Sequence, residues 1–328
     1  MALLEVKDLH TYFQTKKGVL KAVNGVSYEL EAGKTLGIVG ESGCGKSISA
    51  MSILKLLPSN GFIKSGSIYY QGNDLTRYKE KKMNQIRGNE ISVIFQEPMT
   101  SLNPVLTIER QLMEPLQLHQ GMDRHQARQQ ATQLLMKVRI PNPEAIAKGY
   151  AHQLSGGMRQ RVMIAMALAC SPGILIADEP TTALDVTIQA QILKLMNELK
   201  SKLQTGILFI THDLGVIRRM ADNVVVMYCG QIVEYCEVEQ IFQETTYQHP
   251  YTQGLLASLP SSENNPMSRL KTIRGTLPSP YEVPVGCAFT PRCPYATGQC
   301  QKQRPELGLV EDKHWIRCFY PNKEERRG

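Results

Sequence analysis

The sequence predicts an α/β fold in which strands of a largely parallel sheet alternate with helices. Short apolar runs are followed by segments with apolar residues at helical spacing, the usual pattern of such a sheet. The expected strand and helix pairs are 35–39 with 47–57, 173–177 with 186–204, and 206–210 with 214–220. A glycine-rich segment at 40–47 separates the first strand from its helix. Turns of that kind in α/β proteins bind phosphates.

Length and composition limit the class of protein. The chain has 328 residues, enough for about two domains. Hydrophobic residues make up 42% and charged residues 20%, which excludes a disordered chain, and the net charge of +7 demands no particular partner. The N-terminus is charged too early for a signal peptide, and no apolar run is long enough to span a membrane, so a cytosolic chain is expected.

Composition changes near residues 250–260. Half of the 18 prolines lie at or after Pro260, and four of the eight cysteines cluster between Cys287 and Cys318. We therefore predict a nucleotide-binding domain over 1–250 and a smaller C-terminal extension over 251–328. No internal repeat or second nucleotide-binding unit is found.

The glycine-rich segment fits the phosphate-binding pattern G-x-x-x-x-G-K-[ST]. Its glycines let backbone amides turn toward an anion, while Lys46 is suited to the β and γ phosphates of ATP and Ser47 to Mg²⁺. A chance glycine-rich turn is the alternative, which the flanking strand and helix disfavour. The candidate ATP-binding residues of this loop are Gly40, Ser42, Gly43, Cys44, Gly45, Lys46 and Ser47.

A second apolar run, Ile174 to Ala177, ends in two acids. One carboxylate at such a strand end can hold magnesium and the next can activate water. We assign Asp178 to magnesium and Glu179 to general-base catalysis. Together with the glycine-rich loop, these acids predict a nucleoside triphosphatase.

Between these motifs lies the segment Leu154-Ser155-Gly156-Gly157-Met158-Arg159-Gln160-Arg161, with Ser155 suited to cap a helix. LSGG followed by Gln resembles the signature of ATP-binding cassette (ABC) ATPases. The resemblance implies an ABC-type P-loop NTPase, with a RecA-like core, antiparallel β and helical subdomains, and a small Cys-rich C-terminal extension. It also implies a head-to-tail dimer in which Ser155, Gly156 and Gly157 contact ATP held by the partner.

Other positions acquire roles through the same resemblance. Gln96 corresponds to the Q-loop glutamine that contacts Mg²⁺ and the attacking water, and Asp185 to the D-loop at the dimer interface. His212 resembles the switch histidine that contacts the γ phosphate. Phe13 is the candidate for stacking on adenine, with Tyr12 as its rival. The family also implies a helical subdomain at about 97–152 that receives a coupling helix of a transmembrane subunit, so that ATP-driven closure gates transport.

Three further segments indicate which branch of the ABC ATPases this chain resembles. Residues 97–104, 249–252 and 286–294 resemble the peptide and nickel branch of bacterial importer ATPases. This implies dipeptide import, with oligopeptide, glutathione or nickel import as alternatives. The implied partners are a second related ATPase, two transmembrane permease subunits and a periplasmic peptide-binding protein, without nucleic acid. The implied location is peripheral, at the cytoplasmic face of the bacterial inner membrane.

The clustered cysteines, spaced C-x5-C-x6-C-x17-C, predict a metal site. Four thiolates suit either Zn²⁺ or an iron-sulfur cluster, and spacing leaves both open. The family resemblance favours a [4Fe-4S] cluster bound by Cys287, Cys293, Cys300 and Cys318. A structural role is expected because a proline-rich tail with little apolar content needs a cross-link. Nothing in the sequence supports the alternative of a redox sensor.

Two other classes of function are disfavoured. Cassette ATPases that act on DNA or ribosomes generally carry two cassettes, a coiled-coil arm or inserted zinc modules, and none is found here. A non-catalytic regulatory cassette conflicts with the presence of Lys46, Glu179 and His212 together.

Overall fold

The chain divides into two units, each assembled from segments that are distant in sequence. Unit 1 comprises Met1–Leu3, Leu30–Lys34 and Arg77–Ile210, and unit 2 comprises Leu4–Glu29, Thr35–Thr76 and Thr211–Gly328. The structure is a computed structural model, and it describes residues 2–96, 101–182, 184–243, 246–259, 272–324 and 326.

Unit 1 contains a parallel sheet with the strand order β8-β7-β6. The strands are β6 (Ile91–Ile94), β7 (Ile174–Asp178) and β8 (Gly206–Thr211, whose last residue belongs to unit 2). Every residue of β7 and β8 is buried. Parallel strands covered on both faces carry continuous apolar runs, which explains why these segments lack polar alternation.

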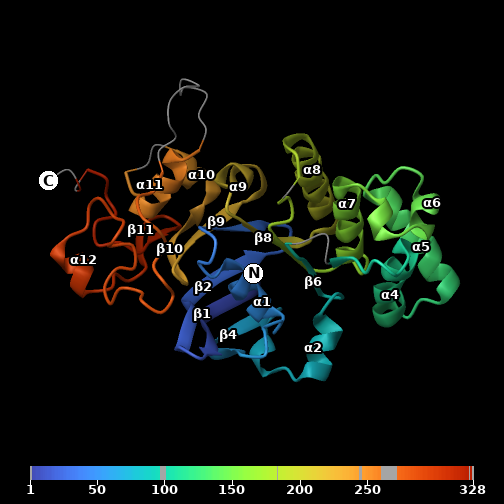
Figure 1. The fold of residues 1–328 in the computed structure, drawn as a ribbon, viewed down its shortest axis with the longest axis horizontal. Helices are drawn as coiled ribbons and strands as arrows, with labels where there is room; N and C mark the ends of the chain where they lie inside the picture. Colours follow the sequence, from blue (N-terminus) through green and yellow to red (C-terminus); the bar gives the residue numbers. More distant parts are fainter. Residues whose placement is uncertain are drawn as a thin grey trace. The chain divides into compact units, whose positions relative to one another are not determined.

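The helices of unit 1 follow the polar, amphipathic part of the sequence. They are α2 (Glu80–Ile86), α4 (Ile108–Gln120), α5 (Arg124–Lys137), α6 (Pro143–Lys148), α7 (Gly156–Ala167) and α8 (Val186–Leu203), with a short 3-10 turn at Ala151–Gln153. A second 3-10 turn, Leu75–Arg77, lies where the chain passes from unit 2 to unit 1. Helices α4, α5, α6 and α7 pack together (Figure 1). Side-chain caps set the starts of α4 and α5, since Thr107 and Asp123 accept hydrogen bonds from the first turns of these helices.

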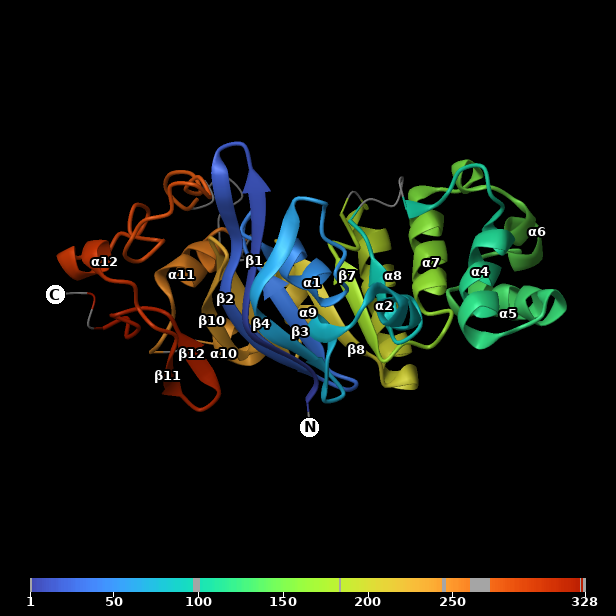
Figure 2. The same cartoon turned by 90° about the horizontal axis from the view of Figure 1, so that it is seen from below.

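Unit 2 contains an antiparallel sheet in the order β2-β1-β4-β5, whose long strands run side by side (Figure 2). Its strands are β1 (Ala2–Thr15, whose first two residues belong to unit 1), β2 (Gly18–Glu31, whose last two residues belong to unit 1), β4 (Gly61–Tyr70) and β5 (Asn73–Asp74). A second group of strands follows the order β11-β12-β10-β9-β3. These are β3 (Thr35–Val39), β9 (Asn223–Tyr228), β10 (Gln231–Glu237), β11 (Gly308–Glu311) and β12 (His314–Ile316). Only the β3–β9 pair of this group is parallel.

Five helices belong to unit 2 within the described ranges. They are α1 (Lys46–Ile53), α9 (Leu214–Met220), α10 (Val238–Phe242), α11 (Pro250–Ala257) and α12 (Gly298–Lys302). Helix α1 follows β3 directly through the glycine-rich loop. The loop therefore occupies the strand-to-helix turn that the sequence predicts.

The α/β alternation is confirmed, with differences at some helix ends. Helix α1 ends at Ile53 rather than residue 57 because Lys55 adopts a left-handed backbone, with φ of 52°, and Leu56 N–H bonds back to Met51. Helix α7 ends at Ala167, and Ser171 beyond it also has a left-handed backbone. Among the described helices, no segment combines the length and apolar character needed to cross a bilayer.

Candidate functional site

The glycine-rich loop of unit 2 packs against neighbouring backbone so closely that Gly40 and Gly45 have no room for a Cβ atom. Gly45, the N-cap of α1, has φ of 102°, and a Cβ atom there would lie 2.3 Å from the carbonyl oxygen of Ala22. A Cβ atom on Gly40 would lie 2.3 Å from the carbonyl oxygen of Met227. The loop also bonds to the turn after β9, where Gly230 N–H donates to Cys44 O at 2.8 Å. The backbone thus holds the loop in one conformation at the N-terminus of α1.

Lys46 is buried within this loop. Its ammonium donates to the carbonyl oxygens of Gly40 at 2.7 Å and Glu41 at 3.1 Å, and the residue is 5% exposed. Ser47 is half-buried beside it, whereas Ser42 and Gly43 are exposed. Burial raises the pKa of the Cys44 thiol, which fills space under the loop. The lysine charge is therefore positioned by backbone carbonyls at the loop itself.

Unit 1 brings together two of the predicted catalytic side chains. Gln96, just beyond β6, donates from Nε2 to Glu179 Oε2 at 3.1 Å. The same carboxylate oxygen accepts from Thr182 Oγ1 at 3.0 Å. Glu179 has φ of 46°, and its N–H donates to Ile210 O at the end of β8. Asp178, the last residue of β7, is 5% exposed. The strand therefore ends in one buried and one half-buried acid, as the sequence predicts.

The signature segment begins helix α7. Ser155 is its N-cap and accepts from Met158 N–H at 3.4 Å, so the predicted cap is confirmed. Gly157 lies against α8, since a Cβ atom there would lie 2.9 Å from Ile188 Cγ2. Asp185 caps α8 by accepting from Ile188 N–H at 2.9 Å. Residues 97–100 of the family motif at 97–104 lie outside the described residues, and so does Ala183, two positions before Asp185 of the D-loop.

The remaining predicted residues lie in unit 2. His212 is exposed and follows β8, immediately before Asp213 caps α9. Phe13 and Tyr12 are half-buried on β1, opposite Gly61 and Phe62. The Tyr12 hydroxyl donates to Asn24 Oδ1 at 3.2 Å. The adenine role of either aromatic stays a prediction.

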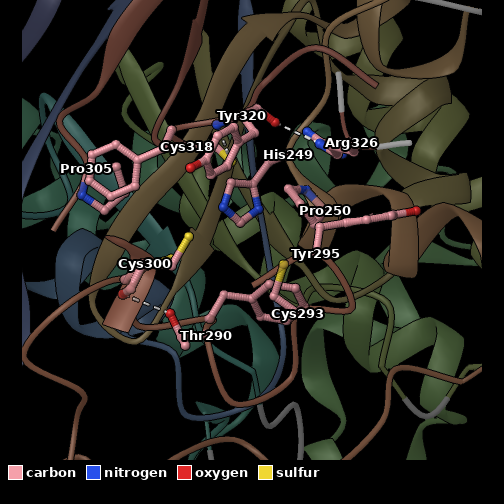
Figure 3. A pocket seen from close by; sticks show the side chains of 13 residues that line it. His249, Pro250, Thr290, Cys293, Tyr295, Cys300, Pro305, Cys318, Tyr320 and Arg326 are labelled. Carbon is pink, nitrogen blue, oxygen red and sulfur yellow. Dashed lines mark hydrogen bonds between the residues drawn. The ribbon is translucent and has the colours of Figure 1, made fainter. Parts of the chain in front are cut away.

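All four clustered cysteines line one pocket of unit 2. Figure 3 shows Cys293, Cys300 and Cys318 around this pocket, together with His249, Tyr320 and Arg326. Burial raises the pKa of the Cys287 and Cys293 thiols, and that of Cys318 to about 11. Burial also lowers the pKa of His249 to about 3, so this ring is neutral at physiological pH.

The spacing of these thiols bears on the kind of metal they suit. In the described part of the chain, one group of three His, Cys, Asp or Glu ligand atoms lies mutually within 4.8 Å, and it contains none of these four cysteines. Four thiolates on one tetrahedral Zn²⁺ would be about 3.8 Å apart, given Zn–S bonds of about 2.3 Å. The four cysteines thus share a pocket without forming such a group, and four thiolates suit either Zn²⁺ or an iron-sulfur cluster.

The group that does meet the distance limit is Glu234, Cys236 and His314, all buried. Glu234 Oε1 pairs with His314 Nε2 at 2.9 Å, while Oε2 accepts from His249 N–H at 2.9 Å and Thr252 Oγ1 at 2.5 Å. Burial alone would lower the pKa of His314, but its hydrogen bonds to Glu234 and Glu311 outweigh burial and raise it. Since both carboxylate oxygens already accept hydrogen bonds, this group is a buried ion pair.

Sequence comparison identifies the family. Residues 23–182 match the family model described as ABC transporter, and residues 233–300 match the model described as oligopeptide/dipeptide transporter, C-terminal region. The chain is 52% identical to the oligopeptide transport ATP-binding protein AppD of Bacillus subtilis (strain 168), over 98% of both chains. It is 46% identical to the dipeptide transport ATP-binding protein DppD of Escherichia coli (strain K12), over 98% of this chain and 97% of the relative.

Solved structures agree with this assignment. A dimeric post-hydrolysis state of the ATP-binding cassette MJ0796, bound to ADP and Pi, superposes with a TM-score of 0.65 at 26% identity, covering 72% of this chain and 98% of that one. CbiO1 from Clostridium perfringens, part of an ABC transporter complex, gives 0.63 at 26% identity, covering 74% and 91%. The chain therefore belongs to the ATP-binding proteins of ABC transporters and is an ATPase with the ABC-type P-loop fold. Within that family it carries the C-terminal region described for oligopeptide and dipeptide transporters.

Sequence reasoning missed the residues that surround Glu41. The Glu41 carboxylate accepts two hydrogen bonds from Arg292, from Nη1 at 2.6 Å and Nη2 at 2.8 Å, and its N–H donates to the Tyr251 hydroxyl at 2.8 Å. Hydrogen bonding to Glu41 is the main reason that the pKa of the Arg292 guanidinium is raised. Both Tyr251 and Arg292 lie in segments that the sequence marked only as family motifs.

Proposed function

We propose that this chain is an ATP-binding and ATP-hydrolysing subunit of a peptide ABC importer, with dipeptides as the transported class. The observation that carries the proposal is the joint presence, in one chain, of the nucleotide loop and the matched C-terminal region. Relatives named for dipeptide or oligopeptide transport align over nearly the whole chain, which supports peptides over glutathione or nickel. Oligopeptide import is the second candidate, because relatives named for oligopeptide transport are 50–52% identical to this chain, against 46% for the relative named for dipeptide transport.

The proposed roles at the ATP site follow the chemistry of each group. Amides of the loop and the Lys46 ammonium bind the phosphates, and Mg²⁺ is held by Ser47, Gln96 and Asp178. Glu179 takes the proton of the attacking water, oriented through its bond to Gln96. His212 contacts the γ phosphate, and Phe13 stacks on adenine.

Two such sites form when two cassettes meet. Ser155, Gly156 and Gly157 of one subunit contact ATP on the other, and Asp185 lies at that interface. The dimeric ADP- and Pi-bound relative supports this arrangement. We propose a second, related ATPase as the partner, two transmembrane permease subunits moved by dimer closure through the helical subdomain at about 97–152, and a periplasmic peptide-binding protein. The subunit would then lie peripherally at the cytoplasmic face of the inner membrane.

For the C-terminal extension, proposed over 251–328, we propose a [4Fe-4S] cluster bound by Cys287, Cys293, Cys300 and Cys318. The shared pocket supports a common ligand, four thiolates suit an iron-sulfur cluster or Zn²⁺, and the family resemblance of the sequence favours the cluster. Such a cluster would cross-link this proline-rich segment at four points. The Arg326 guanidinium lines the same pocket and would offset the negative charge of four thiolates.

The test uses the assembled complex in proteoliposomes with its binding protein. ATP hydrolysis and uptake are measured with a dipeptide, a pentapeptide, glutathione and Ni²⁺ as separate substrates. Stimulation by the dipeptide supports the proposal, and stimulation by the pentapeptide alone supports the second candidate. If the chain instead copurifies with RNA or DNA and no membrane protein, peptide import is contradicted.

A further inference from the structure

The nucleotide loop is held at one residue by the C-terminal part of the chain. Glu41, the second residue of the loop, is bound through its side chain by Arg292 and through its backbone by Tyr251, which lie 251 and 210 positions away. The bidentate geometry matches the two carboxylate oxygens to the two terminal nitrogens of the guanidinium, the strongest form of this pair. Both contacts lie inside unit 2.

Contacts other than the one to Glu41 hold the Arg292 side chain in place. Its side chain is 4% exposed, and Nε donates to the Arg274 carbonyl at 2.9 Å. The guanidinium carbon lies 5.8 Å from the ring centre of Tyr228 and 6.0 Å from that of Phe289. Because these contacts fix the plane of the guanidinium, little side-chain freedom is left to lose when it binds a carboxylate.

The same segment also carries predicted metal ligands. Arg292 immediately precedes Cys293, whose N–H donates to Phe289 O at 3.0 Å. The ring of Phe289 packs against Tyr228 and Tyr251 at centroid distances of 5.2 and 5.5 Å. An aromatic cluster therefore joins the cysteine-bearing segment to the strand and helix that contact the loop.

The Glu41–Arg292 ion pair changes the electrostatics of the nucleotide loop. A loop that binds a triphosphate through amides and a lysine is weakened by a carboxylate in the same loop, since like charges repel strongly in a partly buried site. Glu41 is 29% exposed, so water alone does not screen it fully. We infer that Arg292 is a positioning residue of the nucleotide site, which neutralises and orients Glu41 so that the loop accepts ATP. This inference rests on the proposed ATP site.

The test measures the affinity of the full-length chain for the non-hydrolysable analogue AMP-PNP with Mg²⁺. Arg292→Met exposes the Glu41 charge and is expected to weaken binding about tenfold, the scale of one like charge acting over several ångströms. In the Glu41→Gln background the same substitution is expected to change affinity by less than about twofold, because no charge remains to be exposed. High salt is expected to reduce the loss of AMP-PNP affinity caused by Arg292→Met, because dissolved ions screen the Glu41 charge.

Two further variants separate this role from a purely structural one. Arg292→Lys keeps the charge without the bidentate fork and is expected to lose less affinity than Arg292→Met. Arg304→Met removes an exposed arginine of the same region and serves as the matched control. Iron content and unfolding temperature are measured on every preparation, so that a folding defect is recognised.

An Arg292→Met chain that folds and binds AMP-PNP as tightly as the unmodified chain would overturn the inference, and so would an equal penalty in the Glu41→Gln background. If Arg292→Met fails to fold, the comparison of Arg292→Lys in the two Glu41 backgrounds decides in the same way. Failure of the unmodified chain to bind AMP-PNP would instead overturn the proposed function itself.

Discussion

Gln96 and Glu179 are 83 positions apart in the sequence, yet the amide of one donates to the carboxylate of the other at 3.1 Å. With Thr182 on the same oxygen, two neutral donors restrict how the carboxylate can turn. A group restricted in this way at the end of a parallel strand is well placed to accept a proton from a bound water. The side-chain contact thus links the end of β6 to the end of β7.

Glu179→Gln is expected to preserve ATP binding and to slow single-turnover hydrolysis by about 10²-fold or more, because an amide cannot accept the proton. The measurement uses the assembled complex with the partner ATPase silenced. Glu198→Gln removes a carboxylate of α8 that pairs with Arg139, and serves as the control. Hydrolysis at the unmodified rate by the Glu179 variant would refute its assignment as the base.

Two glycines with positive φ allow the steric cost of a Cβ atom to be measured separately from the cost of backbone strain. Gly45 has φ of 102° and no room for a Cβ, whereas Gly72 has φ of 78° and nothing within 4 Å of that position. Gly72→Ala is expected to lower the free energy of unfolding by about 1 kcal/mol. Gly45→Ala is expected to lower it by more than this and also to weaken nucleotide binding, because its Cβ atom has no room. Unfolding and AMP-PNP binding measured on both variants check this, and equal effects would contradict the steric account.

The cysteine assignment predicts a visible chromophore. Protein purified without oxygen is expected to be brown with about four iron atoms per chain, and Cys300→Ser to lose most of both. Cys170→Ser is the control, because Cys170 belongs to unit 1 and is not among the residues that line the four-cysteine pocket. Colourless protein with one zinc per chain would contradict the cluster.

The His314 and Glu234 pair predicts a pH-dependent stability. Because the pKa of His314 is raised above 6.5 in the folded chain, its stabilising contribution is complete below pH 6.5 and is lost as the pH rises through the folded-state pKa. The free energy of unfolding lost on His314→Gln is expected to be largest near pH 6, about 3 kcal/mol, and to shrink toward pH 9, as measured by denaturant unfolding at each pH. His125→Gln, at an exposed position, is the control. A loss that grows with pH would contradict this account.

Local patterns explain what the sequence predicts well. The loop from Gly40 to Ser47 and the two acids at the end of β7 are each encoded within a few residues, and both lie at strand ends in the structure. The start of α7 was predictable because Ser155 is a strong cap. The early end of α1 was not, since Lys55 has no local signal for a left-handed backbone.

Long-range pairs explain the rest. Nothing near Glu41 in the sequence indicates that its partner is Arg292, and a Tyr at position 251 gives no hint that its hydroxyl accepts a bond from the loop. Such contacts depend on topology that places β9, α11 and the cysteine-bearing segment around one loop. A structure is required to find them, although the family motifs at 249–252 and 286–294 already contained both residues.

The carboxylate of Glu234 has a consequence for attempts to divide the chain. It sits on β10, within the first 250 residues, but its partners His314 and Thr252 come from later in the sequence. A polypeptide stopped at residue 250 would keep an interior negative charge and lose the imidazole that balances it. Deleting the tail to learn its purpose would therefore damage the cassette first, and point substitutions such as those at Arg292 and Cys300 are the cleaner way to ask.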